Sequence, residues 1–155
     1  MATIFNNPRE LLGKDGQVLD TTAWLTIDQQ RIDQFAEITG DKQWIHVDPE
    51  RARSGPFGTT IAHGYLTVSL IGTFLPQIID VRNFSMGVNV GVDGLRFLAP
   101  VPVGSRIRAS GVIVKVDEVK AAAIQCVVRV TIEIEGKEKP ACVLDTISRY
   151  FPQAL

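Results

Sequence analysis

The second half of the chain constrains the fold most, because from about residue 85 onward it is a succession of Val- and Ile-rich segments. These segments predict strands at residues 85–92, 94–97, 105–117, 121–134 and 140–150. The segments after residue 105 are long, and short turn sequences such as Glu135-Gly136-Lys137 join them. Long strands with short connections predict an antiparallel meander.

An apolar helix at residues 62–75 is the other large predicted element. It is apolar nearly all round, which is typical of a helix buried in the middle of a domain, and Pro76 closes or kinks it. One long buried helix and a run of antiparallel strands predict an α+β fold in which the sheet wraps round the helix. Such a sheet has open edges, and we expect a second protomer to cover one of them.

The composition restricts the class of protein. A length of 155 residues favours a single domain over residues 1–155, in which residues 1–16 form an irregular lead-in with at most one helical turn. A net charge of −1 provides no basic surface for nucleic acid. The chain begins without a basic and then apolar leader, and no apolar run approaches the roughly 20 residues of a membrane span. We therefore expect a cytoplasmic protein with reduced, buried thiols at Cys126 and Cys142.

A second helix is predicted upstream of the apolar one. Thr26 or Asp28 caps its first turn, and Gln29 is the capping-box partner of Thr26. Gly40 ends this helix, as a glycine just past a helix end commonly does. The loop that follows therefore begins at Asp41.

Residues 39–65 hold both histidines of the chain, together with several glycines and turn-forming residues. If Asp41 and His46 converge, their carboxylate and imidazole could hold one water molecule and exchange protons with it. They are five residues apart, so no helical spacing brings them together. The alternative is that Asp41 only terminates the helix and that His46 packs on Trp44.

The start of the apolar helix is the second candidate site, with the sequence Ala62-His63-Gly64-Tyr65. Free backbone N–H groups at a helix N-terminus can hold an oxyanion, and Gly64 has no side chain to block the approach. The alternatives are that Gly64 only permits close packing, and that His63 is a capping or hydrogen-bonded core histidine.

Metal and nucleophile sites are also considered. His46, Asp48 and His63 are possible metal ligands, but their spacing matches no compact metal motif and both cysteines lie far away in the sequence. No serine in this region lies in a Gly-x-Ser-x-Gly turn. We therefore predict no metal and no covalent nucleophile.

The order and spacing of these residues form a longer pattern. The pattern consists of Thr39-Gly40-Asp41, a histidine five residues after the aspartate, and Ile61-Ala62-His63-Gly64 some fifteen residues further on. It resembles the hydratase-2 motif of the MaoC-like (R)-specific enoyl-CoA hydratases. The segment Gln43-Trp44-Ile45-His46 is most similar to the nodulation-protein-N-like branch, and the resemblance extends over roughly residues 20–150.

The resemblance implies a hotdog fold and a homodimer whose two sheets join into one. It also implies reversible syn addition of water to a trans-2-enoyl-CoA, which gives an (R)-3-hydroxyacyl-CoA. Asp41 and His46 would be the catalytic dyad, and the N–H of Gly64, flanked by Ala62, His63 and Tyr65, would bind the thioester oxygen. The family needs no metal or organic cofactor, since CoA arrives as part of the substrate. We expect the acyl tunnel to be lined by Tyr65, Phe84, Met86 and Val88.

One departure from the family pattern concerns the loop after Asp41. Many relatives have Asn-Pro where this chain has Gln43 and Trp44, which leaves the preferred acyl length open. A hotdog acyl-CoA thioesterase is a competing interpretation, but such enzymes usually carry a carboxylate on the central helix, and residues 65–75 contain none. A second competing interpretation is a non-catalytic acyl-CoA binder or a dehydratase subunit. The presence of both Asp41 and His46 disfavours it.

Overall fold

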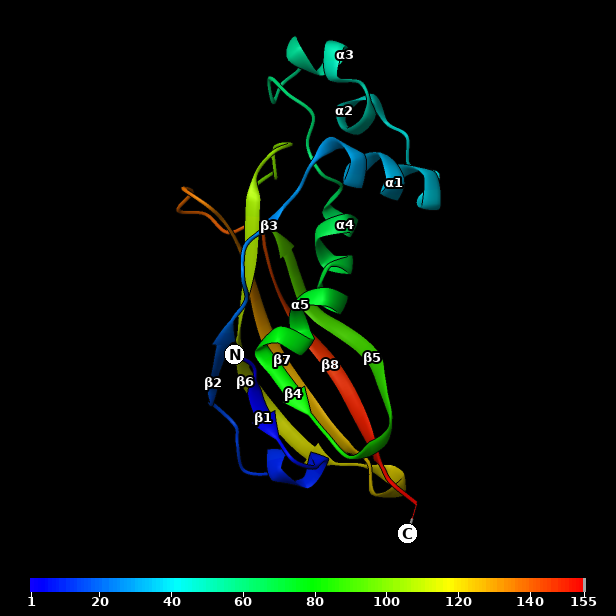
Figure 1. The fold of residues 1–155 in the computed structure, drawn as a ribbon, viewed down its shortest axis with the longest axis vertical. Coiled ribbons are helices and arrows are strands. Elements are labelled where there is room, and N and C mark those ends of the chain that lie inside the picture. The colour runs from blue at the N-terminus through cyan, green and yellow to red at the C-terminus, as the bar shows by residue number, and fades with distance from the viewer. Residues whose placement is uncertain (155) are drawn as a thin grey trace.

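The computed structural model describes residues 1–154, which form one large antiparallel sheet, a two-stranded parallel sheet and a set of short helices (Figure 1). The strands are β1 (Thr3–Phe5), β2 (Val18–Thr21), β3 (Leu25–Thr26), β4 (Ile79–Val81), β5 (Phe84–Phe97), β6 (Arg106–Glu118), β7 (Ile124–Ile134) and β8 (Cys142–Pro152). The α-helices are α1 (Gln29–Thr39), α2 (Trp44–Val47), α3 (Pro49–Arg53), α4 (Gly64–Ser69) and α5 (Ile71–Ile78). Two 3₁₀ turns complete the elements, η1 (Pro8–Leu11) and η2 (Lys120–Ala122).

The large sheet has the strand order β2-β6-β7-β8-β5, and β3 also pairs with β6. The three consecutive strands β6, β7 and β8 are antiparallel neighbours, which confirms the predicted meander and the α+β class. The predicted strands 85–92 and 94–97 form the single strand β5. Its pairing with β8 is irregular between Asp93 and Arg96, where Gly94 adopts a φ of +60° that favours glycine. β5 lies at an edge of the sheet.

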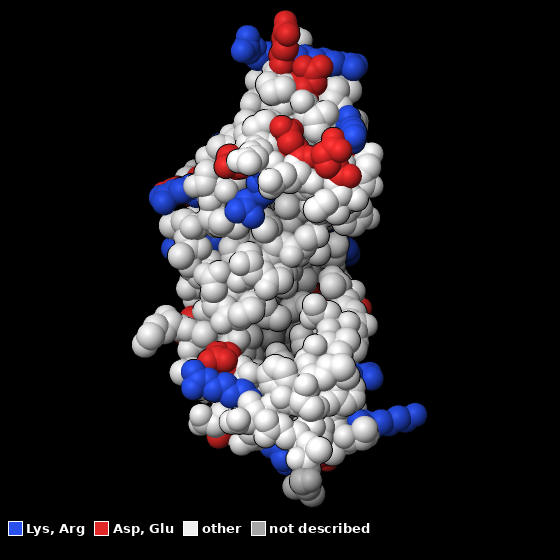
Figure 2. Space-filling model, turned by 45° about the vertical axis from the view of Figure 1, so that its right-hand side comes forward, with Lys and Arg blue, Asp and Glu red and all other residues white. Residues whose placement is uncertain are grey.

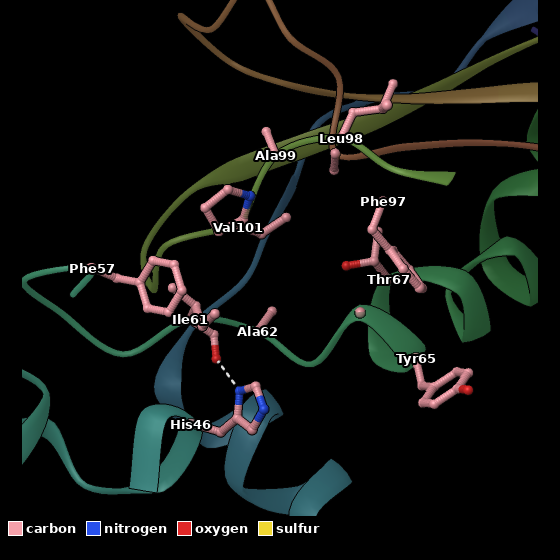
Figure 3. Close-up of a pocket in the computed structure, with 13 residues that line it drawn as sticks. His46, Phe57, Ile61, Ala62, Tyr65, Thr67, Phe97, Leu98, Ala99 and Val101 are labelled. Carbon is pink, nitrogen blue, oxygen red and sulfur yellow. Dashed lines mark hydrogen bonds between the residues drawn. The ribbon is translucent and has the colours of Figure 1, made fainter. Parts of the chain in front are cut away.

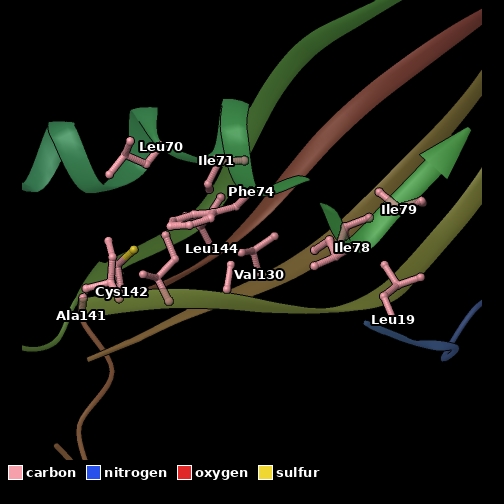
Figure 4. Close-up of a cluster of buried hydrophobic side chains, with 14 of the residues drawn as sticks. Leu19, Leu70, Ile71, Phe74, Ile78, Ile79, Val130, Ala141, Cys142 and Leu144 are labelled. Atoms are coloured by element: carbon pink, nitrogen blue, oxygen red, sulfur yellow. The ribbon is translucent and has the colours of Figure 1, made fainter. Parts of the chain in front are cut away.

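The core lies between the concave face of this sheet and α5 (Figure 4). Phe74 and Ile78 of α5 are fully buried and pack into one cluster with Val130 of β7 and Leu144 of β8. Each such side chain contributes about 1.5–3 kcal/mol through burial. The sheet therefore curls round α5, as the predicted arrangement requires.

The prediction of one continuous helix over residues 62–75 is wrong. The structure has two short helices that meet at Leu70, and His63 has an extended backbone before the first of them. Pro76 lies inside α5 and does not end it. The expectation of burial all round is wrong as well, since the side chain of Tyr65 is 72% exposed.

The first residues are more regular than expected. β1 pairs in parallel with β4, so the lead-in contributes a strand in addition to the helical turn η1. Within residues 1–154, none of the helices combines the length and the apolar character that crossing a bilayer requires. Cys126 and Cys142 are free and buried.

Candidate active site

The loop that carries Asp41 and His46 begins where α1 ends. Gly40 adopts a left-handed conformation with a φ of +79°, and its N–H donates to the Ala36 carbonyl, which turns the chain out of the helix as predicted. The carboxylate of Asp41 then accepts a hydrogen bond from the N–H of Gln43 at 3.4 Å. Asp41 is exposed, whereas His46 lies in the short helix α2 with 7% of its surface exposed.

The imidazole of His46 has a defined tautomer. Its Nδ1 lies 2.7 Å from the carbonyl oxygen of Ile61 and donates to it, because a carbonyl can only accept (Figure 3). Its Nε2 is therefore the basic nitrogen when the ring is neutral. Burial is the largest influence on the pKa of His46 and lowers it below 6.5. The hydrogen bond to Ile61 opposes this shift, a charge on His63 adds to it, and the Asp41 carboxylate opposes it. At neutral pH this group is a base in its uncharged form.

Gln29 holds α2 against the first helix. Its side-chain amide donates to the main-chain carbonyl of His46 at 2.8 Å, and its oxygen accepts the Thr60 hydroxyl at 2.6 Å. Of the two predicted caps, Thr26 and Asp28, the structure has Asp28, which accepts from the N–H of Arg31. Gln29, predicted as the capping-box partner of Thr26, makes these tertiary bonds instead. These bonds span 17 and 31 residues, so no local pattern signals them.

His63 lies behind His46 and is 2% exposed. The two imidazole rings are stacked, with centroids 3.9 Å apart and an interplanar angle of 21°. Nε2 of His63 donates to the main-chain carbonyl of Asp41 at 2.9 Å, and Phe35 packs against the ring at 5.0 Å. Its Nδ1 is buried without a hydrogen-bond partner among the described residues. His63 is thus in contact with the candidate dyad and is absent from the walls of the cavity described next.

The His46 cavity, of about 460 Å³, has the side chain of His46 in its wall (Figure 3). It is almost entirely apolar and is lined by His46, Phe57, Ile61, Ala62, Gly64, Tyr65, Thr67, Phe97, Leu98, Ala99, Pro100, Val101 and Ala141. Gly64 is the first residue of α4, and its N–H has no hydrogen-bond partner in residues 1–154. The ring of Phe97 lies so close that a Cβ on Gly64 would be 2.9 Å from it.

The segment from Phe97 to Val101, which forms one wall of this cavity, was not among the predicted site residues. Of the four residues predicted to line an acyl tunnel, only Tyr65 lies there. Phe84 and Val88 line a second space, the α5 cavity, of about 260 Å³. Its other lining residues are Ile71, Gly72, Leu75, Pro76, Gly87, Asn89, Ser148 and Tyr150, and Met86 lines neither cavity.

Asp41, His46 and His63 form one cluster, in which one donor atom from each residue lies within 4.8 Å of the others. This composition could suit a metal ion, but in-plane lone pairs of two nearly parallel stacked rings do not converge on one point. Asp48 takes no part in the cluster, because it caps α3 by accepting the N–H of Arg51 at 3.1 Å. The cluster is therefore better suited to proton exchange with a bound water molecule.

A sheet curled round a central helical segment defines a hotdog protein. The chain belongs to the MaoC-like family, because the family model described as "MaoC like domain" matches residues 12–136. The chain is similar to "3-hydroxyacyl-thioester dehydratase Z" of Mycobacterium tuberculosis, with 45% identity over 94% of this chain and 97% of the relative. It is also 43% identical to "Nodulation protein N" of Rhizobium leguminosarum, over 86% of this chain and 84% of the relative.

Solved structures have the same fold. The (R)-hydratase from A. caviae, described as involved in PHA biosynthesis, superposes with a TM-score of 0.71 over 85% of this chain and 95% of its own, at 22% identity. A monoamine oxidase regulatory protein from Archaeoglobus superposes with a TM-score of 0.78 over 99% of each chain, at 20% identity. These comparisons confirm the predicted family and fold.

Proposed function

We propose that this protein is an enoyl-thioester hydratase that adds water reversibly to a trans-2-enoyl-CoA and gives the (R)-3-hydroxyacyl-CoA. One observation carries the proposal: His46 lies in a cluster with Asp41 and also lines an apolar cavity together with Gly64, whose N–H has no hydrogen-bond partner among the described residues. The similarity to 3-hydroxyacyl-thioester dehydratase Z supports this class of reaction. Dehydration is the same reaction in the reverse direction.

The chemistry needs three groups. Adding water to C3 of an unsaturated thioester requires a base for the water, a proton for C2 and a donor for the negative charge that develops on the carbonyl oxygen. In the proposed mechanism His46 and Asp41 hold the water between them. The pair takes a proton from the water as its oxygen bonds to C3, and it returns a proton to C2. The N–H of Gly64 donates to the thioester oxygen. A comparable oxyanion donor is worth about 3–4 kcal/mol elsewhere.

Two other functions make different demands on the His46 cavity. A thioesterase of this fold would usually carry a carboxylate on the central helical segment, but α4 and α5 contain no Asp or Glu. A non-catalytic binder would have no use for a buried imidazole that lines the cavity and whose tautomer leaves Nε2 as a basic nitrogen. Both features favour the hydratase.

The experiment is a hydration assay with crotonyl-CoA, followed by loss of the enoyl-thioester absorbance. We expect Asp41→Asn and His46→Ala each to lower kcat by about 10²–10⁴-fold with an intact fold, since each removes one acid–base group. Asp48→Asn is the matched control, because Asn also caps a helix and Asp48 lies outside the cluster; it should retain full activity.

Near-wild-type rates for both dyad variants would refute the proposal. Release of free thiol from a saturated acyl-CoA would identify a thioesterase, and tight binding of enoyl-CoA without turnover would identify a binder. Chiral analysis of the hydration product tests the (R) configuration.

The proposal includes a homodimer in which β5 pairs with a second copy. β5 lies at the sheet edge, and Met86, Val88, Val90 and Val92 on it are each at least 37% exposed. Figure 2 shows a broad uncharged band across this face, with charged side chains gathered toward both ends. We expect Val90→Glu to shift the mass in solution from dimer to monomer, whereas Val112→Glu on β6 should leave it unchanged; a monomeric wild-type protein would refute this part.

A further inference from the structure

We infer that His63 is a positioning residue, which fixes Asp41 and His46 relative to each other and does not touch the substrate. The inference rests on the proposed function, since it concerns the same dyad. It departs from the expectation that His63 helps bind the thioester. Three contacts of His63 carry it, and each reaches a different part of the site.

The first two contacts join the members of the dyad. The Nε2–H of His63 donates to the main-chain carbonyl of Asp41 at 2.9 Å, 22 residues away in the sequence. The ring covers one face of His46 at a centroid distance of 3.9 Å. Asp41 lies in an exposed loop, and its other bonds are local and long, at 3.3 and 3.4 Å. The bond from His63 is therefore its strongest link to the rest of the site.

The third contact joins the dyad to the candidate oxyanion donor. The main-chain carbonyl of His63 accepts the N–H groups of Leu66 and Thr67, at 3.1 and 3.3 Å, so His63 is the N-cap residue of α4, directly before Gly64. One residue thus connects the carboxylate loop, the imidazole and the first amide of the helix. Since His63 is 2% exposed and is absent from the cavity wall, it acts only through these neighbours.

The stacking also has an electrostatic consequence for the base. The titratable groups that face His46 are the His63 ring and the Asp41 carboxylate, whereas the Gln29 amide and the Ile61 carbonyl that also contact it are neutral. A positive charge on His63 opposes a second one on His46, so the pair favours a neutral base. Removal of the His63 imidazole should raise the pKa of His46.

Two variants separate these effects. His63→Phe keeps an aromatic ring against His46 and loses the donor to Asp41, whereas His63→Gln keeps a donor at the same distance along the side chain and loses the ring. We expect His63→Phe to lower kcat for crotonyl-CoA on the order of 100-fold with KM within a few-fold, because a small displacement of reacting groups costs about this much. His63→Gln should retain more of kcat than His63→Phe does.

Stability distinguishes positioning from a merely structural role. His63→Phe removes a buried Nδ1 that has no hydrogen-bond partner within residues 1–154, so its Tm should not fall below that of the wild type. A loss of kcat without a loss of Tm supports the inference. A kcat within twofold of wild type in both variants, or a kcat that falls only in proportion to lost folded protein, overturns it.

The final measurement does not depend on activity. The chain has only two histidines, so either variant leaves His46 as the sole imidazole signal in an NMR titration. We expect its pKa to rise in both variants relative to the wild type, and the acidic limb of kcat/KM to move to higher pH with it. An unchanged pKa overturns the inference. If the wild type hydrates no enoyl-CoA, the proposed function fails while this titration still decides the role of His63.

Discussion

The His46 cavity and the α5 cavity lie along the same helical segment but differ in the chemistry of their walls. The wall of the first combines His46 and Gly64 with apolar side chains. The polar groups of the second are Asn89, Ser148 and Tyr150, and the Ser148 hydroxyl lies 3.4 Å from the Asn89 side-chain oxygen. Burial raises the pKa of Tyr150 to about 12, so this tyrosine stays neutral across the physiological range.

A cavity beside the central helices is therefore not sufficient for acid–base catalysis. Both cavities are apolar enough to hold part of an acyl chain, yet only the first has an imidazole, a possible acid–base group, in its wall. For the proposed reaction, we therefore expect the reacting end of a substrate to bind in the His46 cavity. The α5 cavity is at most a place for the far end of the chain.

The largest expected contrast comes from one added methyl group in each cavity. In Gly64→Ala the new Cβ would lie 2.9 Å from the Phe97 ring, so the ring or the amide must move, whereas a Cβ on Gly72 meets nothing within 4 Å. We expect Gly64→Ala to lower kcat/KM on the order of 100-fold. Gly72→Ala should keep its activity and gain about 0.5–1 kcal/mol of stability, because alanine favours the helix. Steady-state kinetics and thermal melting test both; equal activity losses would remove the distinction between the cavities.

A smaller contrast concerns the acyl chain. Ala99→Leu adds volume to the wall of the His46 cavity, and Val88→Leu adds it to the α5 cavity. We expect Ala99→Leu to lower kcat/KM for an eight-carbon enoyl-CoA about tenfold more than kcat/KM for crotonyl-CoA. The reason is that room for one methylene group in an apolar pocket changes kcat/KM by about this factor. Val88→Leu should change neither value. If instead Val88→Leu alone selects against the long substrate, the chain reaches the α5 cavity.

The smallest effect is on stability as a function of pH. The folded protein holds the pKa of His46 below 6.5, so the unfolded chain binds more protons in the window just under pH 6.5. The contribution of His46 to the free energy of unfolding is complete above pH 6.5, and it is lost as the pH falls through the pKa of His46 in the folded state. We expect the Tm of the wild type to fall by a few degrees more than that of His46→Gln between pH 7.5 and 5.5. Parallel curves would show that His46 titrates normally.

The sequence predicts the fold class well, because the evidence for it is repeated along the chain. β7 alternates buried and less buried residues over its whole length, and long strands with short links leave few arrangements. The break between α4 and α5 has no such signal, since Leu70 and Ile71 are both apolar and buried. Helical continuity is decided there by packing rather than by local preference.

The candidate site is predictable only where it is local. Asp41 and His46 are close in sequence, and a short loop after a glycine-terminated helix brings them into one cluster. The stacking of His63 on His46 depends on where the helix start lies in space, and the bonds of Gln29 depend on two segments meeting. The roles of these residues stay predictions until the variants are measured.

The pairing of β1 with β4 has a mechanical consequence. β4 begins directly after Ile78, the last residue of α5, so the N-terminal strand is attached to the central helix through a ladder of only three residue pairs. A load applied to that end, by a rigid fusion partner or in a force experiment, would be transmitted to α5 before it reached the large sheet. We expect that short ladder to shear first and the β6–β7–β8 sheet to yield last.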